Sequence, residues 1–309
     1  MLRVTSPARV PDRCAGGGAP GLACRLPPQS FFLVSAVFHY LGPSLAVLLF
    51  NRVSVLGVAW LRIVTAALVF AVWRRPWRLA SRLDRRGLRV LLALGAVLAG
   101  MNSLFYLAIG RLPLSTVGAI EFLGTVGLAA LGVRTRRNAA ALALTTAGVA
   151  VITQIRITGQ PLGFVFAFGN CVLFMLYVIL GHKIANTGQS RADTGGIDRL
   201  GASMLIAAVV VSPAGLTGAV AAFSHPLLLL AGAGVGVCSS VIPYVTDQLA
   251  MARLPRATFA LMLALMPMFA TLTGAVVLQQ IPTPPDLIGI ALVITGVAAH
   301  QATRPQERS

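Results

Sequence analysis

The sequence carries the segment LAIGRLP at residues 107–113 and a close copy, LAMARLP, at residues 249–255, which is 142 positions later. In each copy a threonine follows the proline three residues further on. A second pair of short segments, AGVA at 147–150 and TGVA at 295–298, lies at a similar spacing. These repeats indicate that the chain consists of two related halves.

The composition is typical of a membrane protein. Hydrophobic residues make up 57% of the 309 residues and charged residues 11%, whereas soluble proteins average roughly 45–50% and about 25%. A soluble fold needs more polar surface than this chain has. The apolar residues form unbroken runs rather than the short alternating segments of a membrane β-barrel.

The apolar runs are long enough for membrane-spanning helices, which need about 20 residues to cross a hydrocarbon core of about 30 Å. They lie at about 31–51, 54–73, 88–108, 113–133, 138–155, 161–182, 199–217, 225–246, 255–278 and 284–301. The sequence therefore predicts an all-α integral membrane protein with ten transmembrane helices. We expect a disordered basic cytoplasmic tail at 1–29, five-helix repeats at 30–156 and 157–302, and a cytoplasmic tail at 303–309.

The basic residues predict the orientation of these helices. Of the 25 basic residues, 24 are arginines and one is Lys183. With the N-terminus inside, 21 of them lie in inner segments, while Arg52, Arg111 and Arg156 lie outside and Arg62 lies within a helix. Because basic loops stay in the cytoplasm, we expect both termini there and the protein in the inner (plasma) membrane. The net charge of +17 then reflects topology, and no nucleic-acid partner is expected.

Five helices per half, an odd number, predict that the second half is inverted relative to the first. The loop with Arg111 then faces outside, and its copy with Arg253 faces inside. Inverted repeats are the architecture of secondary transporters, because two near-equivalent halves can exchange inward-open and outward-open states. We therefore expect the protein to transport a small-molecule substrate across the lipid bilayer.

Glu121 is the only acidic residue that we expect well inside a membrane helix. A carboxylate there costs at least about 2.5 kcal/mol unless it is protonated, paired or facing water. One interpretation is an acid that binds a proton or the amine of a substrate. The alternative is a partner for Arg62, which lies at a similar depth of roughly 12 Å in helix 2. A pair that also gates the pathway would satisfy both interpretations.

Other polar residues in the apolar runs are candidates for the transport pathway. Asn102 and Tyr106 share one face of helix 3 near the level of Glu121, although an interhelical hydrogen bond would explain them equally well. Tyr177 on helix 6 could line the path from the inner side or be an interfacial tyrosine. His39 on helix 1 is a weaker candidate that could titrate in a pathway.

Proline residues mark two expected helix breaks. Pro243 in helix 8 is flanked by Ser239, Ser240 and Tyr244, and broken helices commonly line transport sites. A kink whose freed backbone groups are satisfied by Ser240 is the alternative. Pro267 in helix 9 is the second expected break.

The sequence contains no nucleotide fingerprint, no metal-ligand cluster and no set of nucleophile and base. We therefore expect no cofactor and no metal, and neither an ATP-driven pump nor an enzyme. Asp247, at the inner end of helix 8, is a weaker pathway candidate that we expect to be a solvated cap near Arg253. The sequence leaves a homodimer open.

Several long motifs resemble one known family. The stretch GMNSLFYLAIGRLPLSTVGAIEFLG at 100–124 resembles the helix 3–4 signature of the threonine/homoserine exporter (RhtA-like) group. That group belongs to the EamA-type drug/metabolite transporter superfamily. The resemblance continues through WLRIVTAALVFAVWRRPWRLA at 60–80, MLYVILGHKIA at 175–185 and SSVIPYVTDQLAMARLPRATFALMLAL at 239–265.

The resemblance implies a ten-helix secondary carrier that exports small amino acids such as threonine or homoserine by proton antiport. It also implies roles for individual positions. The matching residues are Asn102, Tyr106 and Glu121 in the helix 3–4 polar set, Arg62 in helix 2, Tyr177 in helix 6, and Ser239, Pro243 and Tyr244 in helix 8.

Four positions depart from the family pattern. The family usually has a lysine where this chain has Val47, and a proline where it has Thr125. It usually has a glutamate where this chain has Met266, and a Gly-Glu pair where it has Gln279-Gln280. Glu121 therefore lacks its counterpart acid in the second half. These apolar and neutral replacements favour a broader drug or metabolite efflux carrier as the first alternative. The second alternative is a degenerate, non-transporting membrane protein that acts through a partner.

Overall fold

The computed structural model describes residues 28–76, 85–132, 136–154, 160–186, 195–251 and 266–301. Every regular element within these ranges is a helix, and no strand occurs in them. The helices are α2 (Pro28–Leu49), α3 (Val55–Arg74), α5 (Arg85–Ile109), α6 (Leu114–Gly132), α7 (Arg136–Gln154), α8 (Pro161–Asn186), α9 (Gly195–Phe223), α10 (Pro226–Gly236), the π-helical turn η1 (Val237–Val241), α11 (Ile242–Met251), α13 (Met266–Leu278) and α14 (Pro284–Gln301).

The helices coincide with the apolar runs of the sequence. Within the described ranges, five segments are long and apolar enough to cross a membrane, namely Gln29–Leu49, Val55–Arg74, Gly87–Ile109, Asp198–Phe223 and Pro226–Thr246. Shorter apolar helices lie at Leu114–Gly124, Ala139–Val151, Pro161–Tyr177, Met266–Leu278 and Pro284–Gly296. The prediction of an all-α membrane protein is confirmed. Residues 28–29 of the expected first tail belong to α2, whereas residues 1–27, the second tail and residues 255–265 lie outside the described ranges.

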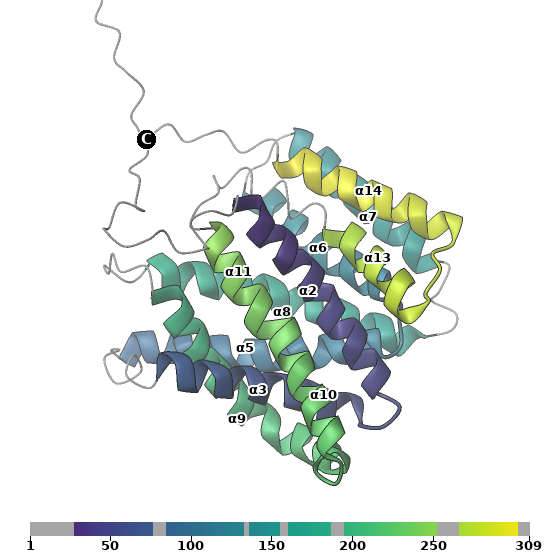
Figure 1. Ribbon diagram of the computed structural model, residues 1–309. Coiled ribbons are helices and arrows are strands. Elements are labelled where there is room, and N and C mark those ends of the chain that lie inside the picture. Colours follow the sequence, from purple (N-terminus) through teal and green to yellow (C-terminus); the bar gives the residue numbers. More distant parts are fainter. Residues whose placement is uncertain are drawn as a thin grey trace, which may run out of the picture.

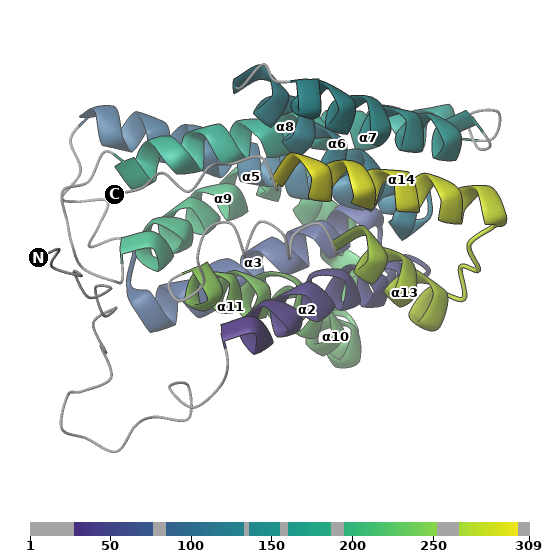
Figure 2. The ribbon, with the colours of Figure 1, turned by 90° about the horizontal axis from the view of Figure 1, so that it is seen from above.

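The helices pack in pairs along their length. α3 lies against α9, α7 against α14, and α5 against α8, while α2 contacts both α11 and α13. Figure 1 shows the α7–α14 pair at one corner of the bundle. In the view from above, most helices run side by side in the same general direction (Figure 2). The result is a bundle with two ends and an apolar outer wall.

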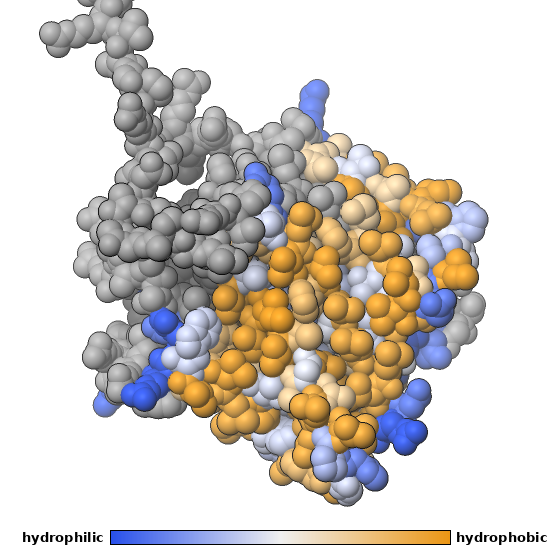
Figure 3. Space-filling view, in the orientation of Figure 1, coloured by the Kyte–Doolittle hydropathy of each residue, from blue (hydrophilic) through white to orange (hydrophobic). Residues whose placement is uncertain are grey.

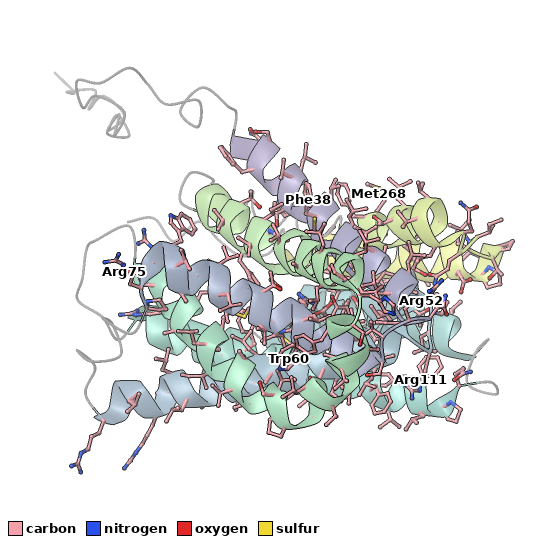
Figure 4. All side chains as sticks on the ribbon, turned by 60° about the horizontal axis from the view of Figure 1, so that its bottom comes forward. Phe38, Arg52, Trp60, Arg75, Arg111 and Met268 are labelled. Atoms are coloured by element: carbon pink, nitrogen blue, oxygen red, sulfur yellow. The ribbon has the colours of Figure 1, made fainter. Side chains whose placement is uncertain are left out.

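Figure 3 shows this wall on one face, where apolar residues cover α2, α10, α11 and α13 and hydrophilic residues gather at the edges. The exposed apolar side chains of these four helices include Leu48, Leu227, Leu230, Leu272 and Val276. Charged residues lie at the ends of the bundle: Figure 4 places Arg75 at one end and Arg52 and Arg111 at the other. An apolar wall between two charged ends is the surface that a lipid bilayer requires.

Glycine brings the backbones of α3 and α9 into contact. A Cβ atom on Gly57 would overlap the carbonyl oxygen of Gly218 and would lie 2.7 Å from the amide nitrogen of Ala219. Since such groups belong to the backbone, neither can rotate away. Gly234 of α10 offers a contrast, because a Cβ atom there would meet nothing within 4 Å.

We expect Gly57→Ala to lower the free energy of unfolding by about 1–3 kcal/mol, because α3 and α9 must move apart. The matched control is Gly234→Ala, which adds the same methyl group in open space and is expected to be neutral or slightly stabilising. Thermal unfolding of the purified variants in detergent measures both. Equal unfolding temperatures for the two variants would contradict the close packing of α3 on α9.

Candidate functional site

The α10–α11 segment is interrupted by a wide turn. In η1 the backbone N–H of Ile242 donates to the carbonyl of Val237, five residues earlier. Pro243 follows directly and has no N–H to donate to the carbonyl of Ser239 four residues before it. Single π-helical turns are rare and frequently occur at functional sites. The helix break expected at Pro243 is thus a π-helical turn just before the proline, and the chain continues as helix on both sides.

Arg62 of α3 binds this turn. Its guanidinium Nε donates to Ser240 Oγ at 2.9 Å, and its Nη2 donates to the Ser239 carbonyl at 3.0 Å. The Arg62 guanidinium carbon also lies 5.2 Å from the centre of the Tyr106 ring on α5. Only 5% of the Arg62 surface is exposed. Charge-assisted hydrogen bonds and a cation–π contact therefore hold a buried cation among three helical segments.

Close helix contacts fix the position of η1. A Cβ atom on Gly42 of α2 would overlap Ser239, and one on Gly236 would lie 2.9 Å from the carbonyl oxygen of Arg62. Ser35 Oγ of α2 donates to the carbonyl of Pro243 at 3.3 Å. The turn is thus packed between α2 and α3, which explains how the Arg62 side chain reaches its backbone.

Glu121 of α6 is buried, with 6% of its surface exposed. It forms no direct ion pair with Arg62 in the described part of the chain, although the two charges interact through space. The neighbours of the Glu121 carboxyl are Asn170 of α8 and, from α2, Tyr40. The hypothesis that Glu121 serves only as the ion-pair partner of Arg62 therefore has no direct contact to support it.

Two glycines of α6 show how these neighbours approach Glu121. The Tyr40 hydroxyl lies 3.3 Å from the position of a Cβ atom on Gly118, one helical turn before Glu121. One turn after Glu121, a Cβ atom on Gly124 would lie 2.6 Å from the sulfur of Cys171. Residues three apart share a helix face, so α2 and α8 bring polar side chains to the face of α6 that carries Glu121.

Several buried polar atoms of α2, α5, α6 and α8 have no regular hydrogen-bond partner among the described residues. They are the hydroxyls of Tyr40, Tyr106 and Thr116 and both the nitrogen and the oxygen of the Asn170 amide. Buried polar groups are hydrogen-bonded in the great majority of cases, and leaving one unpaired costs about 1–3 kcal/mol. Unpaired groups beside a buried acid indicate a site built for a polar ligand.

Tyr40 and Asn170 are absent from the candidates that the sequence predicted. Asn170 carried a usable signal, since it is a lone amide within the apolar run FAFGNCVLF at 166–174. Tyr40 carried none, because a tyrosine in an apolar run is commonly part of the core. Only the packing of α2 on α6 at Gly118 places it near Glu121.

The other predicted residues are placed as follows. Asn102 Nδ2 donates to the Leu98 carbonyl of its own helix at 2.8 Å. The His39 ring packs edge-on against Tyr40, with ring centres 5.2 Å apart. Tyr177 and Tyr244 pack against the apolar cluster that contains Phe70, Leu98 and Met204. The side chain of Asp247 lies outside the described part of the structure.

Helix α13 shows what replaces the family's acids. Met266 and Pro267 are buried in the first turn of its described part, and no acid stands there. At the other end, Gln280 Oε1 accepts a hydrogen bond from the backbone N–H of Leu114 at 3.1 Å. Gln280 thus caps the start of α6, a position where a carboxylate would also be stabilised. Gln279, which precedes it, has a φ of 54°.

We expect Gln279→Gly to raise the free energy of unfolding by up to about 1 kcal/mol, because the left-handed conformation strains residues other than glycine. The control is Gln279→Ala, which removes the same side chain but retains the strained backbone and is expected to give no gain. Denaturation of both variants in detergent compares them. A glycine variant no more stable than the alanine variant would contradict strain at this position.

Comparison with known proteins agrees with this geometry. Residues 161–299 match the EamA-like transporter family. The chain is 29% identical over 299 residues to the threonine/homoserine exporter RhtA of Escherichia coli (strain K12), covering 93% of this chain and 97% of the relative. The resemblance to the EamA-type, RhtA-like transporters is confirmed. The RhtA of Salmonella typhimurium (strain LT2) is 29% identical over 298 residues, with the same coverage.

A solved crystal structure has a similar fold. It covers 91% of this chain and 100% of its own, with a TM-score of 0.55 and 18% sequence identity. Together with the apolar helices, the relatives indicate a multi-pass membrane transporter.

Proposed function

We propose that this EamA-type protein is a secondary transporter of the plasma membrane that exports small amino acids or related metabolites by alternating access and proton antiport. The observation that carries the proposal is the buried Glu121 carboxyl, which has unpaired polar groups beside it and a buried Arg62 nearby. The names of the relatives, threonine/homoserine exporters, support an amino-acid substrate.

The helix contacts support ten membrane helices in two inverted five-helix repeats. Counted along each half, α3 and α9 are the second helices and α7 and α14 are the fifth, and both pairs are in contact. α5, the third helix of the first half, contacts α8, the first helix of the second half. In the same way α11, in the third helix of the second half, contacts α2, the first helix of the first half. Exchanging the halves therefore maps these contacts onto one another, as a pseudo-two-fold axis requires.

The positions of the helix ends support cytoplasmic termini on one side. The start of α2 and the end of α14 lie at the same end of the bundle in Figures 1 and 2. Arg75 lies at one end and Arg52 and Arg111 at the other (Figure 4), as expected for the inner and outer segments respectively. This arrangement supports an even number of crossings.

Competition at Glu121 would couple export to protons. An ionised carboxylate binds the ammonium group of an amino acid, whereas a protonated carboxyl does not. Uptake of a proton from outside would release the substrate there, and loss of the proton inside would restore the binding site. The Arg62 guanidinium has five N–H groups. Since two of its nitrogens contact Ser239 and Ser240, the remaining N–H groups are available for the carboxylate of the substrate.

Direct flux measurements test this function. Purified protein in proteoliposomes is assayed for counterflow of labelled threonine, homoserine and a panel of other amino acids, and cells that lack or overproduce it are compared for exported metabolites. Amino-acid flux driven by a pH gradient supports the proposal. Flux restricted to apolar drugs or other metabolites would support the broader efflux carrier, which the buried Met266 favours. Absence of any flux would support a non-transporting protein.

A further inference from the structure

Asn170 of α8 is fully buried, yet neither atom of its amide has a hydrogen bond of regular geometry among the described residues. The Tyr40 hydroxyl of α2 is in the same condition, also with no exposed surface. The Asn170 amide and the Tyr40 hydroxyl are both near Glu121, one approaching from α8 and the other from α2. Three oxygen-bearing side chains from three helices thus meet at one place.

Other polar side chains in these helices use a simpler arrangement. The hydroxyls of Thr145, Ser203 and Ser212 each donate to a carbonyl four residues earlier in their own helix, and the amide of Asn102 does the same. An asparagine placed only to fill a helix interface would be satisfied in this way or by a neighbouring helix. The Asn170 amide has no such bond within its own helix, and its interaction with Glu121 of α6 lacks regular hydrogen-bond geometry, which distinguishes it from these structural groups.

The geometry fits one chemical group in particular. An ammonium group has three N–H donors and no acceptor. The site offers three acceptors, namely a carboxylate oxygen of Glu121, the hydroxyl oxygen of Tyr40 and the amide oxygen of Asn170. A proton on the carboxyl of Glu121 would need at most one acceptor, so proton binding alone does not account for both neighbours.

We propose that Tyr40, Asn170 and Glu121 form the subsite for the primary ammonium group of the transported substrate, and that Tyr40 and Asn170 determine the preference for substrates with this group. The proposal rests on the proposed function, because it assumes an amino-acid substrate. It adds two specificity-determining residues, one from each half of the chain, to the acid that the sequence indicated.

The test uses Asn170→Leu, which keeps the approximate size of the side chain without its polar atoms, and Tyr40→Phe, which removes a single oxygen. Each variant is assayed in proteoliposomes with an amino acid that the wild-type protein transports and with the 2-hydroxy acid of the same side chain. We expect kcat/KM for the amino acid to fall by about tenfold or more in each variant, as for loss of a hydrogen bond to a charged group. For the hydroxy acid we expect a fall of less than about threefold, so the preference for the amino acid decreases.

The matched control is Thr145→Val, which removes a buried hydroxyl that bonds within its own helix, and its substrate preference should equal that of the wild type. Equal losses for both substrates in the Asn170 and Tyr40 variants, or no loss, would overturn the subsite. Tyr40→Phe retains the aromatic ring, so it decides the question if Asn170→Leu does not fold. If the wild-type protein transports no amino acid at all, the proposed function fails first, and the subsite fails with it.

Discussion

Export driven by a pH gradient is expected to fall by at least about tenfold when Glu121 is replaced by glutamine. Glutamine has nearly the same size as glutamate but neither takes up a proton at neutral pH nor forms an ion pair with an ammonium group. The replacement therefore removes the coupling step and weakens substrate binding. Counterflow of a labelled amino acid into proteoliposomes, measured with and without a pH gradient, separates these two effects.

The control for Glu121→Gln is Asp198→Asn at the start of α9. Asp198 forms an ion pair with Arg74 at 2.7 Å, but both side chains are partly exposed, so the change should cost less than about 1 kcal/mol and leave the gradient effect intact. Gradient-driven flux that is unchanged in Glu121→Gln would remove this acid from the mechanism. Flux that is lost in both variants would point to misfolding instead.

Replacement of Arg62 by alanine is expected to reduce the free energy of unfolding by at least about 2 kcal/mol and to abolish transport. The change leaves the Ser239 carbonyl and the Ser240 hydroxyl without their buried donor and removes the cation from the Tyr106 ring. Arg62→Lys should recover only part of the stability, because one ammonium group does not reproduce the fork of the guanidinium. Thermal unfolding in detergent and counterflow in proteoliposomes measure the two effects.

Arg74→Gln provides the comparison for Arg62→Ala. Arg74 also has an ion pair and a cation–π contact, with Asp198 and with Trp73 at 5.7 Å, but it lies at a partly exposed helix end. Its loss should cost less than about 1 kcal/mol. If the Arg62 and Arg74 variants were equally stable, the buried contacts of Arg62 with η1 would contribute nothing, contrary to our interpretation.

Much of the fold could be predicted from the sequence because a lipid environment imposes a simple pattern. A membrane helix needs about 20 apolar residues, so each helix appears as an uninterrupted run. The π-helical turn η1 could not be predicted in this way. It has the same apolar composition as the α-helical turns beside it, and Pro243 indicates that a backbone carbonyl is freed without specifying how the helix adapts.

The candidate site was only partly accessible from the sequence. Glu121 and Arg62 stand out because a charge in an apolar run is costly. The alternative that they pair directly is not supported, and the partners that Arg62 does have, Ser239 and Ser240, lie 177 and 178 residues away in the chain. Contacts over such separations depend on helix packing, which the periodicity of one helix does not specify.

The five-residue turn η1 also makes the length of this helix a constraint on the evolution of the protein. A π-helical turn holds one residue more than the α-helical turn that it replaces. Deletion of one residue there would close the wide turn to regular α-helical geometry. The hydrogen bonds that Arg62 makes to Ser239 and Ser240 of this turn would then be disturbed although the arginine had not changed. Loops tolerate insertions and deletions, but we expect none within η1 in relatives that share Arg62.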